Sequence, residues 1–320
     1  MLFSQKLLRR ILGLLWLIDG LLQLQPQMFT TNMINSVLLP NLQSQPAPIS
    51  ASLHEIIALM TQHITLVNLL VGIVQTEIGL FLLAGVWVRG TVITSIIWAL
   101  IVWYGGEGMS MLLTGQASIL TGAPGAVLLY PLLGLLVYPR TPRSKETPAK
   151  ASTDSLLSQE QFRWVLSGFW LFAALLQLQP YWWQPGQISQ TISNSVGLGG
   201  YNKILVDPVL QQLSIITASR EMVLNIGLIV VFLGLSLTLA VVKPRHLRPW
   251  LALSIVISLM IWWGIQGFGM VFTGMATDFN SGLLLVFMAL ACWPKGSRRQ
   301  VTRGQAVPEI SQSEGTTQLA

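Results

Sequence analysis

Long runs of apolar residues constrain this chain more than any other feature of its sequence. The runs at 66–88 and 222–242 each reach the roughly 20 residues that a helix needs to cross ~30 Å of hydrocarbon. Shorter runs complete a set of four in each half of the chain. The full set lies at 10–25, 66–88, 91–104, 123–138, 164–180, 222–242, 249–264 and 282–294. The sequence therefore predicts an all-α polytopic membrane protein with eight transmembrane helices.

Composition excludes several other classes of protein. Charged residues make up 9% of the chain, against about 25% in ordinary soluble proteins. Hydrophobic residues make up 52%, which is too much apolar surface for a soluble enzyme to cover and too much for a disordered chain. The one cysteine, Cys292, excludes an intramolecular disulfide framework and a cysteine metal cluster.

The chain contains an internal repeat. The letters LLQLQP at 21–26 recur at 175–180, and WYGGEG at 103–108 is paralleled by WWGIQG at 262–267. Repeats of this length indicate a duplicated structural unit. We predict two tandem four-helix bundles at 1–139 and 163–294, a cytoplasmic linker at 140–162 rich in Pro, Ser, Lys, Thr and Glu, and a disordered basic and polar cytoplasmic tail at 295–320.

The basic residues predict the orientation in the membrane. With eight spans, all the lysines and arginines except Lys203 and Arg220 fall on one side. The positive-inside rule then places both termini in the cytoplasm, as in a multi-pass protein of the inner membrane. The net charge of +6 therefore reports topology, and the partner we predict is the lipid bilayer, with no nucleic acid.

Each predicted outer loop carries an amphipathic pattern. In the first half, Ser52 and Glu55 fit a capping box, and Leu53, Ile56 and Ile57 begin an apolar face. In the second half, Asp207 fits an N-cap, with proline at the next position. We expect an amphipathic helix near the outer membrane surface in each half.

Ionisable residues inside a membrane are the first candidates for a functional site, because each costs about 3 kcal/mol to insert. Asp19 and Glu77 lie at mid-depth of predicted helices, and Glu107 lies near the outer end of another. The residue that matches Glu107 in the second repeat is Gln266, and all three acids belong to the first repeat. We take Asp19, Glu77, Glu107 and Gln266 as candidates for binding a ligand or a proton. Structural hydrogen bonding by these residues remains the open alternative.

Glycine-rich segments at 105–125 and 264–282 follow the third helix of each repeat. Such backbone is tolerated at membrane depth where it lines a cavity, and glycines also allow close helix packing. The candidates for lining a cavity are Gly105, Gly108, Thr114, Gly264, Gly267 and Thr273. The sequence shows no catalytic constellation and predicts no metal site, since His54 and His63 are nine positions apart and lack further ligands.

The opening of the chain carries a resemblance to a known family. RILGLL at 10–15 is followed by DGL at 19–21, with Arg10, Gly13 and Gly20 at the positions that carry the motif. A four-helix membrane unit with this opening and a large outer loop resembles the DoxX/DoxD-like group. The resemblance implies a membrane subunit associated with oxidoreductases, in some members a thiosulfate:quinone system.

Three functions follow from these observations as hypotheses. The leading one is an accessory or redox-partner membrane subunit without catalytic residues of its own, which binds a small lipophilic ligand such as quinone and associates with a redox protein or with copies of itself. The second is a proton-coupled secondary transporter that uses Asp19 and Glu77 as proton carriers. The third is a structural membrane scaffold.

Overall fold

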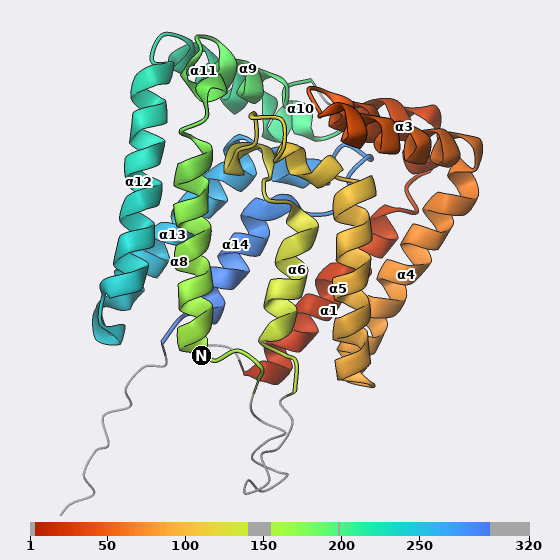
Figure 1. Cartoon of the computed structure of the whole chain (residues 1–320), viewed down its shortest axis with the longest axis horizontal. Coiled ribbons are helices and arrows are strands. Elements are labelled where there is room, and N and C mark those ends of the chain that lie inside the picture. The colour runs from red at the N-terminus through yellow and green to blue at the C-terminus, as the bar shows by residue number, and fades with distance from the viewer. Residues whose placement is uncertain (1–3, 140–154, 198, 295–320) are drawn as a thin grey trace, which may run out of the picture.

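The computed structural model describes residues 4–139, 155–197 and 199–294, and these ranges are helical throughout apart from loops and an isolated bridge between Pro139 and Ser155. Each predicted apolar run forms a helix, within a few residues of the expected bounds. The helices that form from these runs are α1 (Gln5–Leu22), α4 (Ile64–Ala84), α5 (Val88–Gly105), α6 (Ala126–Leu135), α8 (Gln159–Leu176), α12 (Glu221–Val241), α13 (Leu247–Gly264) and α14 (Asn280–Ala291). Figure 1 shows them packed together in one upright set.

Four of these helices are long and apolar enough to cross a membrane. Within the described ranges they are Ile64–Ala84, Val88–Gly105, Glu221–Val241 and Pro244–Gly264, which adds a short turn to α13. Their outer faces carry many exposed large apolar side chains, such as Leu66, Leu70 and Val230. Contiguous apolar surface of this kind indicates a protein embedded in a membrane.

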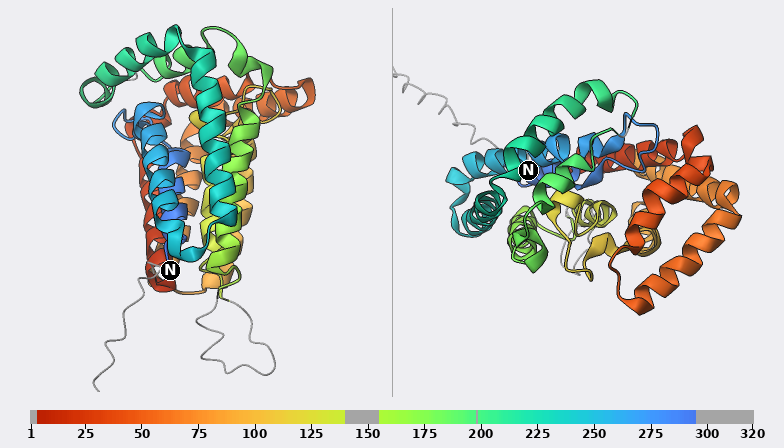
Figure 2. Two further views of the ribbon diagram at one scale, coloured as in Figure 1. Left: turned by 90° about the vertical axis from the view of Figure 1, so that its left-hand side faces the viewer. Right: turned by 90° about the horizontal axis from the view of Figure 1, so that it is seen from above.

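Shorter helices lie across one end of the upright set, the upper end in Figures 1 and 2. They are α3 (Ala47–Gln62), α9 (Gln187–Ser193), α10 (Asn202–Leu205) and α11 (Asp207–Ala218). The predicted amphipathic helices are α3 and α11. Leu53 and Ile57 of α3 are buried, as the apolar pattern predicts.

The two predicted caps of these helices are wrong in detail. α3 begins at Ala47, because Pro46 and Pro48 favour a helix start there, and Ser52 lies in its interior. The Ser52 hydroxyl instead donates to the carbonyl of Ile49 and is hydrogen-bonded to the Tyr104 hydroxyl. Asp207 is the first residue of α11 rather than its N-cap, and it accepts a hydrogen bond from the Gly197 N–H.

The linker and the tail are described in part. Residues 140–154 of the predicted linker and the whole predicted tail lie outside the described ranges. The rest of the linker leads into α8, which begins at Gln159, four residues before the predicted start of the second repeat. Ser158 and Gln161 form a capping box there, so the helix is closed by its own side chains.

Helix α1 packs most extensively on α4, and α8 packs in the same way on α12. The α1/α4 contact depends on glycine. A Cβ added to Gly20 would lie 2.7 Å from the Thr76 nitrogen, and one added to Gly79 would lie 2.5 Å from the Leu17 nitrogen. Small residues of this kind let two membrane helices approach backbone to backbone.

One hydrophobic core joins the two halves of the chain. It includes Trp16 and Tyr130 from the first half and Trp170 and Phe232 from the second. Two glutamines add reciprocal hydrogen bonds between the halves: Gln25 donates to the Ala276 carbonyl at 3.2 Å, and Gln179 donates to the Ala117 carbonyl at 3.1 Å. The glycine-rich loops are thus each held by the opposite half.

Candidate functional site

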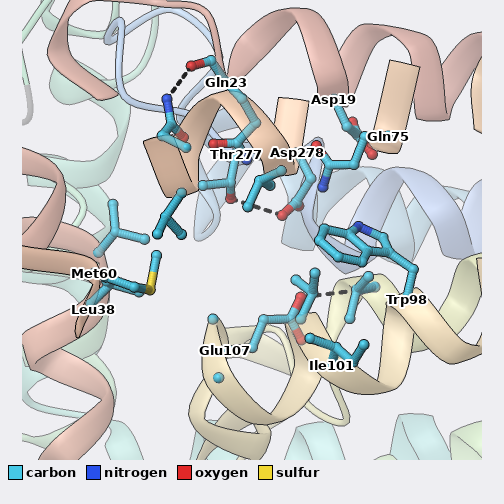
Figure 3. Close-up of a pocket in the computed structure, with 18 of the residues that line it drawn as sticks. Asp19, Gln23, Leu38, Met60, Gln75, Trp98, Ile101, Glu107, Thr277 and Asp278 are labelled. Atoms are coloured by element: carbon cyan, nitrogen blue, oxygen red, sulfur yellow. Dashed lines mark hydrogen bonds between the residues drawn. The ribbon is translucent and has the colours of Figure 1, made fainter. Parts of the chain in front are cut away.

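A cavity of about 270 Å³ lies in the first half of the chain, beneath α3 and between α1, α4, α5 and α6 (Figure 3). One wall of the cavity is apolar and includes Leu38 and Met60. Polar side chains gather opposite, where Asp19, Gln75 and Asp278 lie close together in Figure 3. The last two contributors, Thr277 and Asp278, come from the loop before α14 and therefore from the second half.

Seven polar atoms of this lining are buried and have no partner at normal hydrogen-bond geometry among the described residues, although the Tyr130 hydroxyl lies near the Asp19 carboxyl group. A buried polar atom without a partner costs about 1–3 kcal/mol, and such atoms are rare in folded proteins. A cluster of seven therefore indicates a place for bound molecules that supply the partners. The atoms are Nε1 of Trp16 and Trp98, Oδ1 of Asp19 and Asn68, Oε1 of Gln23 and Gln75, and the hydroxyl of Tyr130.

Both donors and acceptors are present in this set. The two indole N–H groups can only donate, the amide and carboxylate oxygens accept, and the Tyr130 hydroxyl can do either. Asn68 Nδ2 already donates to the Gln23 carbonyl, at 2.6 Å. A ligand head that both accepts and donates hydrogen bonds, on an apolar body, would match this lining.

Glu107 is held at the edge of the cavity by its surroundings. It lies two residues after the end of α5, and its Oε1 accepts a hydrogen bond from the Val127 N–H at 3.0 Å. The Ser110 hydroxyl donates to Oε2 at 3.2 Å. Gly125 has φ 127° and must lack a side chain, because a Cβ there would lie 2.4 Å from Glu107 Oε2.

A second acid, Asp278, also lines this cavity. Its Oδ1 accepts the Asn280 N–H at 2.5 Å, and its Oδ2 accepts the Thr277 hydroxyl at 2.9 Å. Burial raises the pKa of Glu107 from 4.5 to about 8, and the nearby charge of Asp278 adds to this rise. Burial also raises the pKa of Asp278.

A second cavity, of about 200 Å³, adjoins the first. The two cavities share Val37, Gly106, Glu107, Thr277 and Asp278 in their linings. Polar side chains also line the second cavity, among them Asn41, Ser110 and Asn280. The two carboxyl groups therefore lie where a largely apolar cavity meets a polar one.

At the matching place in the second half, the buried Phe232 stands at the position that Gln75 has in the first. Gln266 makes the backbone contact that Glu107 makes: its Oε1 accepts the Gly282 N–H at 3.0 Å. Its Nε2 donates to the Ile119 carbonyl and to the Ser281 hydroxyl, so the amide is fully used. Phe232 packs against Trp170, with the ring centroids 5.3 Å apart.

The structure places only some of the predicted site residues in the first cavity. Asp19, Glu107 and Gly105 line the first cavity. Glu77 does not: contrary to the expectation of a buried carboxyl, its side chain lies on the exposed face of α4, because the helix turns Gln75 and Ile78 inward instead. Gln266 is buried, and its amide is hydrogen-bonded to Ser281 and Gly282 of the second half and to the Ile119 carbonyl of the first.

The other candidates hold loops in place. The Gly108 carbonyl accepts from Gln45 at 2.8 Å, and the Gly267 carbonyl accepts from Asn202 at 3.4 Å. The hydroxyls of Thr114 and Thr273 both bond to a carbonyl three residues earlier, at 2.7 Å. Gly264 lies beside Leu213 of α11. These five residues are absent from the lining of the first cavity.

Sequence reasoning missed Gln75, Trp98, Tyr130 and Asp278, all of which line the cavity. Asp278 was detectable in principle, since it is an acid in one glycine-rich segment at a place where the other segment carries apolar residues. The remaining three look like ordinary residues of apolar helices, and only packing shows which way they face. Comparison with protein-family models, with curated proteins and with solved structures finds no match to this chain.

Proposed function

We propose that this chain is an inner-membrane protein that binds a small lipophilic ligand with a neutral polar head, such as a quinone, in the cavity beneath α3. The observation that carries the proposal is the cluster of seven buried polar atoms without partners in an otherwise apolar cavity. A quinone or hydroquinone head offers carbonyl or hydroxyl groups to such a cluster, and its tail is compatible with the apolar wall.

The membrane arrangement is part of the same proposal. Eight spans, as two tandem four-helix bundles with both termini in the cytoplasm, would place α3 and α11 at the outer surface. Paired contacts support the duplication: Asn68 and Asn225 donate to the carbonyls of Gln23 and Gln177. Trp103 and Trp262 also each donate to a carbonyl in the loop that precedes the next helix.

The resemblance to the DoxX/DoxD-like group supports a role as an accessory or redox-partner subunit. Such a subunit would hold the ligand while a protein partner, or another copy of this chain, supplies the chemistry. A transporter that uses Asp19 and Glu77 receives less support, because Glu77 faces away from the cavity. A pure scaffold does not account for seven unpaired polar atoms.

A decyl-substituted benzoquinone is a suitable probe for the full chain in lipid nanodiscs. Quenching of tryptophan fluorescence would report binding, since Trp16 and Trp98 line the cavity. The test variant is Gln75→Phe. Gln75 lies seven positions after Asn68, and the residue seven positions after the matching Asn225 is the bulky Phe232, so phenylalanine already occupies this place in the second half. The matched control is Glu77→Gln, on the exposed face of the same helix.

We expect saturable binding to the unaltered chain and to the control, and a loss of at least about tenfold in affinity for Gln75→Phe, which corresponds to about 1.4 kcal/mol. Absence of saturable binding to the unaltered chain would contradict the proposal. Equal binding by Gln75→Phe would also contradict it, because the probe would then sit elsewhere.

A further inference from the structure

Glu107 and Asp278 occupy the boundary between the two cavities. Both carboxyl groups line the apolar first cavity and the polar second one. The second cavity is also lined by Thr121, which is exposed, so it reaches the surface of the protein. A molecule in the first cavity and water in the second can therefore both contact this pair of acids.

Among the residues that the structure describes, the side chains around the pair include acids and no base. Lysine, arginine and histidine are absent from the described lining of either cavity. The titratable groups that act on Glu107 and its neighbours are Asp278, Asp19 of α1 and Tyr130 of α6. With no positive charge to offset them, loss of one proton from the pair opposes loss of the next.

The second half shows that a carboxyl group is not needed for the fold at position 107. Gln266 accepts the equivalent backbone N–H at the same 3.0 Å distance with an amide oxygen. An amide cannot release a proton at ordinary pH, whereas a carboxyl with a pKa of about 8 exchanges one near neutrality. Proton exchange is thus what the acid adds over the amide.

We propose that Glu107 and Asp278 form a proton-exchange pair between a ligand in the first cavity and water in the second. When a hydroxyl-bearing lipophilic ligand such as a hydroquinone is bound, its O–H bond breaks as a new O–H bond forms on a carboxylate oxygen, and the ligand is left as its oxygen anion. The carboxyl group then releases that proton to water in the second cavity. The step moves a proton only, and it rests on the proposed function for the identity of the ligand.

The pair can be tested without any ligand. Infrared spectroscopy of the full chain in nanodiscs detects the carbonyl band of a protonated carboxyl group, and we expect a band that is lost as pH rises through about 8. Glu107→Gln should abolish the band that is lost near pH 8, and Asp278→Asn should move the midpoint of this band to lower pH by removing the neighbouring charge. Glu77→Gln should leave the band unchanged. A band lost near pH 8 that persists in Glu107→Gln would overturn the proposal, and so would the absence of any such band from the unaltered chain.

A second measurement separates this proposal from the proposed function. A pH-indicator dye outside the nanodiscs should report proton release when decyl-hydroquinone binds above the midpoint, and the release should disappear in both Glu107→Gln and Asp278→Asn. Quinone binding without any titrating band would leave the proposed function in place and reject the pair. A titrating band without quinone binding would support the pair and reject quinone as the ligand.

Discussion

The Glu107 side chain has two roles, one structural and one in proton exchange. One oxygen supports the start of α6 through the Val127 N–H, and the carboxyl group as a whole lines both cavities. The structural role needs only a hydrogen-bond acceptor on a side chain of this length, whereas the proposed proton exchange needs a group that can lose a proton. Substitutions can separate the two roles.

We predict that Glu107→Ala destabilises the protein by about 1–3 kcal/mol, because it leaves the Val127 N–H without its acceptor. Glu107→Gln keeps that acceptor and should be close to neutral at low pH. Thermal unfolding in detergent, followed by intrinsic fluorescence, measures both. If both variants lost the same free energy of unfolding, the hydrogen bond to the Val127 N–H would not be the source of the stabilisation.

The raised pKa of Glu107 predicts how stability depends on pH. Between pH 4.5 and about 8 the folded protein holds a proton on Glu107 that the unfolded chain has released. The free energy of unfolding should therefore fall as pH rises through this window, and the loss should be complete above it. Glu107→Gln should flatten the profile. A profile of unchanged slope in that variant would contradict the assignment.

At the scale of helices, the interface of α1 with α4 sets the shape of the cavity wall. Gly79 faces the backbone of Leu17, which cannot move aside for a side chain. On α12, Gly234 has nothing within 4 Å of where its Cβ would be. The two helices therefore provide a matched pair of helical glycines in different surroundings.

We predict that Gly79→Ala lowers stability by about 1–3 kcal/mol, the usual cost of overpacking. Gly234→Ala should be neutral or slightly stabilising, because alanine favours a helix over glycine by about 1 kcal/mol. Thermal midpoints in the same detergent compare the two. If Gly79→Ala were as stable as Gly234→Ala, the close approach of α1 and α4 would be wrong.

Helices were the part of this fold that the sequence could predict. Apolar runs bounded by charged or proline-containing segments locate α4 and α12 closely, because burial and lipid contact favour the same residues. Facing was harder. Gln75 and Glu77 are two positions apart on one helix, yet one enters the cavity and the other is exposed. A sequence pattern that is apolar all round carries no signal for that choice.

The cavity itself could be predicted only in part. Asp19 and Glu107 were found because isolated acids are costly in a membrane. Asp278 was not, since it lies in a loop where acids are ordinary, and its importance depends on a contact between residues far apart in the chain. Tertiary contacts of this kind leave no periodic trace in the sequence.

For the molecule as a whole, the proposed topology places α3 on the outer, periplasmic side of the inner membrane and the turn after α12 in the cytoplasm. Cys292 is buried and is the single cysteine of the chain, so Cys292→Ser gives a background without reactive thiols. In that background we predict that His54→Cys reacts with a membrane-impermeant maleimide on intact cells. Lys243→Cys should react only after the membrane is opened. The opposite result would invert the topology.

The reciprocal glutamine bonds also make a prediction at this scale. Gln25→Ala combined with Gln179→Ala removes one hydrogen bond from each glycine-rich loop to the opposite half. At about 0.5–1.5 kcal/mol for each hydrogen bond, we expect a combined loss of roughly 1–3 kcal/mol. Gln116→Ala is the control, since its amide bonds to an exposed hydroxyl, that of Ser44. Equal thermal midpoints for the double variant and the control would contradict this role.

These bonds also impose an order on biosynthesis. The Ala117 carbonyl precedes its partner Gln179 by 62 residues, whereas Gln25 precedes Ala276 by 251. At translation rates of about 5–20 residues per second, the Gln25 amide is made roughly 10 s or more before its acceptor exists. The N-terminal helices of the nascent chain must therefore stay in the bilayer before this hydrogen bond can form. The close α1/α4 contact, which depends on glycine, stabilises them during that time.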